Sequence, residues 1–452
     1  MKKLFCMITS LFLVVCIGCK TIDGTSSIIE ELTNVVESQI TNEVSSETTS
    51  SDESESSIPT PSTPSKPTVT TPENTPSSPS TVIVETEVKE DEYVVIKPDP
   101  IVIKGDKPMS YEKISNEQQR LYAILKDAIF NMVKENIDLQ VNESKSDSTD
   151  IFTDVNVAFR AVQFDNPECF WAPSGYAMIQ SGSKRFINFV YNGADDSTSY
   201  DYPISKAERD VMVKELNKKV DELINAVSGM DSFETEVYLH DYLCKNVTYT
   251  DNKDPLVYTS YGALVDGKAV CEGYSRAMQL LCDKLEIPCG LVYGWSQNTG
   301  HMWNIINPGD GWYHLDITWD DDESNNIVSH RYFNVTKESI THTDAQGNGH
   351  IIADNYKKNA RYNADDVFNF LSSDCNNTNL NYFVRNGYIV SQLDSKDVAL
   401  IRHLAEQNPK FLEFQNNSGK SNQEVINSSV MEALGNNQIY YYDSYNIISI
   451  IR

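Results

Sequence analysis

Three residue types that can catalyse acyl transfer follow one another in a short stretch of this 452-residue chain. Apolar residues at i, i+3, i+4 and i+7 from Cys271 predict that this cysteine begins an amphipathic helix. The free N–H groups and the positive dipole end at a helix start favour a thiolate there. His301 and Asp316 follow, on two segments in which apolar and polar residues alternate, and could serve as base and orienter.

The segments that carry His301 and Asp316 are predicted to form a β-hairpin. Residues 307–311 (NPGDG) between them are a strong turn signal. With Asn307 opposite Asp310, His301 stands directly opposite Asp316 on the same face of the sheet. The pattern thus predicts a histidine–carboxylate pair, although it does not show that this pair meets the cysteine.

The motifs around these residues are VCEGYS at Cys271, GHMWN at His301 and WYHLDITWDD at Asp316. Over residues 235–335 they resemble the bacterial form of the transglutaminase-like superfamily, which has a papain-like cysteine fold. The resemblance implies an α+β core, with the cysteine-bearing helix packed on an antiparallel sheet. It also implies a catalytic triad of these three residues, for which no cofactor and no metal is expected.

The triad predicts attack of a thiolate on an amide carbonyl, with the backbone N–H of Cys271 as one oxyanion donor. The second donor stays open among Asn246, Tyr258 and Tyr261. We expect a hydrolase of protein or peptide substrates, cell-wall peptides included. A crosslinking transferase is the alternative, but Glu272 stands where animal crosslinking transglutaminases have tryptophan. A non-catalytic cell-wall binding module is a third possibility, which an intact triad disfavours.

The N-terminal part of the chain predicts an anchored protein. Residues 1–19 resemble a lipoprotein signal peptide that ends in a lipidated Cys19, with simple secretory cleavage as the alternative. Residues 20–107 are rich in Ser, Thr, Pro and Glu, which is typical of a disordered tether. We therefore expect a lipid-anchored protein on the extracytoplasmic face of the cell membrane. The net charge of −28 argues against nucleic acid as a partner.

Three further regions follow the tether. Residues 108–230 are predicted to be mainly helical, with one small hairpin formed by GYAMIQ and FINFVY, and residues 231–350 to form the catalytic domain. Residues 351–452 are predicted to form an α/β extension, in which NYFVRNGYIVS is the first strand and IYYYDSYNIISII the last.

Other polar residues have plainer interpretations. The position of His240 in a helix favours a structural histidine, because the triad already has its base. The acidic run 320–323 lacks the spacing of a calcium loop, which favours a solvated turn. No CxxC pair accompanies His330, His342 and His350, so the sequence predicts no structural zinc site.

Overall fold

The computed structural model describes residues 83–85, 88–89, 92–102, 110–141, 148–192, 198–199, 203–250, 254–296, 299–322, 326–343, 349–353, 369–371, 374–435 and 440–452. The predicted signal peptide, Cys19 and most of the predicted tether lie outside these described residues. Within them, no helix is both long enough and apolar enough to cross a bilayer.

The first folded region is built on a six-stranded sheet with the order β1-β4-β5-β3-β2, in which β6 pairs with β5. Its strands are β1 (Ile83–Glu85), β2 (Tyr93–Val94), β3 (Asn136–Asp138), β4 (Gly175–Ser181), β5 (Lys184–Asn192) and β6 (Thr198–Ser199). The predicted hairpin is confirmed as β4 and β5, with Gly182 in the turn at a φ of +54°. The sheet around that hairpin was not predicted.

Strands β1 and β2 correct the predicted end of the tether. They lie between residues 83 and 94, yet they pair in parallel with β4 and β3. Ile96, just after β2, is buried in the main hydrophobic core. The tether therefore cannot extend to residue 107 as predicted, because part of that range belongs to the sheet.

Capping residues set the starts of the long helices. Ser115 and Ser205 each form a capping box, at α3 (Asn116–Phe130) and at α5 (Lys206–Ala226). Asp231 forms a third at α6 (Ser232–Asn246). The remaining helical segments of this part are η2 (Ser110–Lys113) and α4 (Ser148–Asp165), and α4 packs against α3.

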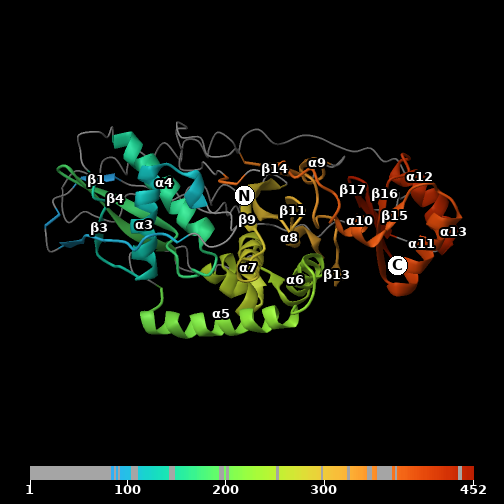
Figure 1. The fold of residues 1–452 in the computed structure, drawn as a ribbon, viewed down its shortest axis with the longest axis horizontal. Helices are drawn as coiled ribbons and strands as arrows, with labels where there is room; N and C mark the ends of the chain where they lie inside the picture. The colour runs from blue at the N-terminus through green and yellow to red at the C-terminus, as the bar shows by residue number, and fades with distance from the viewer. Residues whose placement is uncertain are drawn as a thin grey trace, which may run out of the picture. The chain divides into compact units, whose positions relative to one another are not determined.

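The central region carries the predicted catalytic residues on an antiparallel sheet with the order β11-β10-β9-β14. Helix α7 (Cys271–Lys284) packs against β9 and β10 of this sheet (Figure 1). Its strands are β9 (Cys289–Ser296), β10 (Thr299–Ile306), β11 (Tyr313–Leu315) and β14 (His350–Ile352). The α+β class and the packing of a cysteine-bearing helix on an antiparallel sheet are therefore confirmed.

Short elements complete the central region. Two small ladders are formed by β7 (Thr248–Tyr249) with β8 (Lys268–Ala269) and by β12 (Asp321–Asp322) with β13 (Ile327–Val328). The short helical segments are η4 (Pro255–Tyr258), η5 (Gly262–Asp266), α8 (Ile317–Asp320) and α9 (Lys337–Thr341).

The last region is an α/β unit on a sheet with the order β15-β16-β18-β17. Its strands are β15 (Ile389–Val390), β16 (Phe411–Asn416), β17 (Tyr440–Ser444) and β18 (Ile447–Ile451). Its helical segments are α10 (Tyr382–Asn386), α11 (Ser395–Gln407), α12 (Asn422–Val425), η6 (Ile426–Val430) and α13 (Met431–Leu434).

Two predicted strands of this unit are wrong. The first half of NYFVRNGYIVS forms the helix α10, because Asn381 caps its N–H groups and Gly387, at a φ of +71°, ends it. Only the two residues of β15 within that segment are a strand. The predicted final strand is a hairpin of β17 and β18, which turns at Tyr445 with a φ of +53°.

Candidate active site

Tight backbone contacts position Cys271 at the start of α7. Gly267 ends η5 with a φ of +66°, and the Val270 N–H then donates to the Val257 carbonyl at 3.0 Å. A Cβ on Gly273 would lie 2.4 Å from that same carbonyl oxygen, so only glycine allows η4 to approach so closely. Cys271 is half-buried, and as the first helical residue its N–H has no intrahelical acceptor.

Side-chain hydrogen bonds fix α7 against the strand that carries His301. The Ser275 hydroxyl donates to the Met302 carbonyl at 3.0 Å, and the Asn304 amide donates to the Ser275 carbonyl at 3.0 Å. Met302 and Asn304 are the strand neighbours whose side chains face the helix. The position of the cysteine relative to His301 is therefore set by buried polar contacts.

The predicted hairpin register is wrong by two residues. Ile306 pairs with Tyr313, and β11 ends at Leu315, so His301 does not stand directly opposite Asp316. The turn is longer than predicted because the Asn307 side chain accepts hydrogen bonds from the N–H groups of Gly309 and Gly311. A shift of two residues keeps every side chain on its predicted face, so the two functional groups still meet.

His301 and Asp316 form a buried hydrogen-bonded pair. His301 Nε2 donates to Asp316 Oδ2 at 2.7 Å, and both residues are at most 6% exposed. Asp316 Oδ1 accepts the Trp319 N–H at 3.2 Å, which fixes the carboxylate as the cap of α8. These bonds leave Nδ1 as the ring nitrogen of His301 that can serve the Cys271 thiol.

Charge at this site favours an imidazolium. Burial would lower the pKa of His301, but the charge and hydrogen bond of Asp316, with a further hydrogen bond to the Cys271 sulfur, raise that pKa to about 10. Burial likewise opposes ionisation of Asp316, yet the charge of His301 holds the pKa of the carboxyl well below its usual range. The structure thus brings together the cysteine, the histidine and the carboxylate that the sequence singled out.

His350 is a site residue to which the sequence assigned no role. Pairing of β14 with β9 places it beside the triad, where its Nε2 donates to Asp316 Oδ2 at 2.7 Å. It is 2% exposed, and its ring centroid lies 5.1 Å from that of Trp303 and 5.0 Å from that of Trp319. No local pattern could have found it, because its contact with Asp316 spans 34 residues.

Two of the three candidate second oxyanion donors are engaged elsewhere. The Asn246 amide donates to the Tyr242 carbonyl at 2.8 Å. The Tyr261 hydroxyl donates to Glu215 on α5 at 2.7 Å. Tyr258, the last residue of η4, is half-buried.

The acidic run after the triad is not the solvated turn that we predicted. Asp320 is fully buried, and its carboxylate accepts the Tyr332 N–H at 3.0 Å and lies 3.3 Å from His240 Nε2. The Tyr274 hydroxyl donates to Asp321 at 2.6 Å. Asp320 is therefore buried and Asp321 half-buried, because donors from α6, from α7 and from the segment after β13 converge on them.

Comparison with known families and structures gives a match over part of the chain. Residues 221–317 match the family model of the transglutaminase-like superfamily. A solved structure described as a TGase shares 13% identity over 40% of this chain and 50% of its own, with a TM-score of 0.23. A candidate cysteine protease from Cytophaga hutchinsonii shares 15% identity over 28% and 46%, with a TM-score of 0.20.

This chain therefore spans half or less of the length of either solved protein, and TM-scores this low carry no argument about activity. No curated protein matches the chain.

Proposed function

Because residues 221–317 are a transglutaminase-like superfamily domain, we propose that this protein is a cysteine-dependent hydrolase of peptide or amide bonds at the cell envelope. The observation that carries the proposal is the hydrogen bond of 2.7 Å between His301 and Asp316, next to the thiol at the start of α7. The signal-like residues 1–19 and their terminal Cys19 support an anchor outside the cytoplasm.

The proposed reaction begins with attack of the Cys271 thiolate on the substrate carbonyl. The helix start supplies the N–H of Cys271 to the developing oxyanion. His301, protonated at Nδ1, gives that proton to the departing amine as the C–N bond breaks, which leaves a thioester. His301 then removes a proton from water, which attacks the thioester and releases the carboxylic acid and the thiol. Asp316 holds the imidazole at Nε2 throughout.

The test uses the chain without residues 1–19, incubated with purified cell wall and with peptides that carry glutamine. Mass spectrometry of the products should show peptides released with the addition of one water, or glutamine side chains in which water has replaced the released ammonia. The Cys271→Ala protein is the matched control and should release nothing. Equal release by both proteins would refute the proposed nucleophile.

Including a labelled primary amine in the same incubation separates hydrolysis from crosslinking. A hydrolase should leave the label free, because water resolves the thioester. Incorporation of the label that depends on Cys271 would instead show the crosslinking transferase. A protein that binds cell wall tightly but changes neither substrate would be a binding module.

A further inference from the structure

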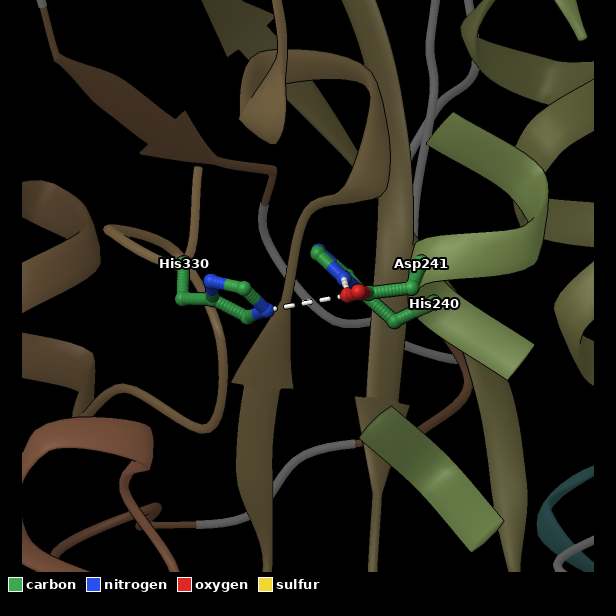
Figure 2. Close-up of side chains that lie close together, drawn as sticks. All are labelled: His240, Asp241 and His330. Carbon is green, nitrogen blue, oxygen red and sulfur yellow. Dashed lines mark hydrogen bonds and ion pairs between the residues drawn. The ribbon is translucent and has the colours of Figure 1, made fainter. Parts of the chain in front are cut away.

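A second cluster of histidines and a carboxylate is formed by α6 and the segment after β13, and it shares no residue with the triad. Asp241 Oδ1 lies 3.2 Å from His240 Nδ1 and 2.9 Å from His330 Nε2 (Figure 2). The three ligand-type atoms all lie within 4.8 Å of one another. Only the fold brings this cluster together, because His330 follows Asp241 by 89 residues.

Each of the three side chains also lies near a charged group through its other nitrogen or oxygen atom. The other ring nitrogen of His240 lies 3.3 Å from Asp320 Oδ2, and the other ring nitrogen of His330 lies 3.9 Å from Glu413 Oε2. Lys245 Nζ binds the second oxygen of Asp241 at 2.8 Å. A carboxylate behind a histidine is the arrangement that orients metal-binding imidazoles in proteins.

We propose that His240, Asp241 and His330 form a binding site for a divalent transition metal of the zinc type. Two imidazoles and one carboxylate suit zinc, whereas calcium and magnesium prefer oxygen alone. Zinc binds these atoms at about 2.0–2.2 Å, so ligand atoms in a tetrahedral site lie roughly 3.3–3.6 Å apart. The two separations from Asp241, 3.2 Å and 2.9 Å, lie just below that range, and the two imidazole nitrogens lie within 4.8 Å of each other.

The surroundings supply both access and compensating charge. A cavity of about 1020 Å³ is lined by Asp241 and His330, and also by Cys244, Tyr382 and Glu413. It leaves room for water or a small ligand as a fourth donor. Asp320 and Glu413 are almost fully buried, and Asp241 adds a third carboxylate, whereas the cations beside them are Lys245 and Arg331. A divalent cation would offset more of this buried negative charge.

The metal would tie the last region of the chain to the central one. Glu413 belongs to β16, and it accepts hydrogen bonds from the His330 N–H at 2.9 Å and from the Ser329 hydroxyl at 2.7 Å. His330 is also stacked on Tyr382 of α10, with ring centroids 3.6 Å apart. Metal binding should therefore stabilise these contacts against unfolding.

The test measures zinc affinity of the chain without residues 1–19, carrying Cys271→Ala so that the triad thiol cannot bind metal. After treatment with a chelator, zinc is titrated in competition with a coloured chelator. We expect one equivalent of zinc to bind. The zinc affinity of His330→Ala and of Asp241→Asn should be more than about 100-fold lower. Asp320→Asn, which changes only an outer partner, should lose about 10–100-fold.

The other cluster of two histidines and a carboxylate among the described residues contains His301, Asp316 and His350. His350→Ala is therefore the matched control, and it should keep the full affinity. Circular dichroism establishes that each variant is folded. X-ray absorption of the zinc-loaded Cys271→Ala protein, which needs no ligand variant, should show imidazole ligands and a tetrahedral shell.

Failure to bind one equivalent would overturn the proposed site. So would unchanged affinity in His330→Ala, loss of affinity in His350→Ala, or a metal shell without imidazole.

Discussion

His301→Ala should slow the alkylation of Cys271 by removing a cation beside the thiol. The pKa of His301, raised from 6.5 to about 10, means that the imidazole stays protonated through the neutral range. At about 1.4 kcal/mol for each pKa unit, the rise is on the order of 5 kcal/mol of stabilisation of the imidazolium, and this cation stabilises a neighbouring thiolate. Replacing His301 removes the cation entirely.

The magnitude follows from the charge that is removed. At about 4 Å, a unit charge stabilises an opposite charge by about 1 kcal/mol at the dielectric constant of water and by about 4 kcal/mol at an effective value of about 20. At about 1.4 kcal/mol for each factor of ten, we therefore expect the alkylation rate at neutral pH to fall roughly 5-fold to 1000-fold. The alkylation rate of Asp316→Asn should lie between those of wild type and His301→Ala. The same substitution should reduce catalytic turnover by about 10⁴-fold.

The assay is iodoacetamide labelling of the native protein, followed by peptide mapping over time. The other described cysteines should label slowly because they are buried, and burial raises the pKa of Cys244 to about 11. His314→Asn is the matched control: burial lowers the pKa of His314 to about 3, so its loss removes no cation. Faster labelling of another cysteine, or equal rates in His301→Ala and wild type, would refute a working thiolate–imidazolium pair.

Four other predictions concern anchoring, stability and the triad. Cys19→Ala should leave the protein unprocessed or free of the membrane, and membrane fractionation would measure this. Normal processing and anchoring of the variant would rule out lipidation. Removing residues 20–82 should not change the melting temperature, whereas a chain that starts at Asp106 also lacks β1 and β2 and should melt several degrees lower by calorimetry. Because its folded pKa is raised, His301 should stabilise the fold fully below pH 6.5 and lose this contribution as pH rises through about 10; a stability gap to His301→Gln that does not narrow over that window contradicts this. His350→Ala removes a hydrogen-bond donor to Asp316, which should raise the pKa of that carboxyl and move the acidic limb of the pH–activity profile to higher pH. An unchanged acidic limb would indicate that His350 is purely structural.

Local patterns determined the parts of the site that depend on one helix or one strand. The helical period from Cys271 predicted the start of α7, and α7 begins at that residue. Alternation in β10 predicted the face of His301, and this survived the shift in register because a strand repeats every two residues. Capping boxes at Ser115 and Ser205 likewise use contacts within three residues.

The tertiary structure alone decided the contacts between distant segments. Pairing of β14 with β9 brings His350 to the triad carboxylate, and packing of the segment after β13 on α6 brings His330 to Asp241. Asp320 looked like part of a solvated acidic run, but donors from separate elements surround it. Such contacts depend on how strands and helices pack, and neither spacing nor composition along the chain encodes that arrangement locally.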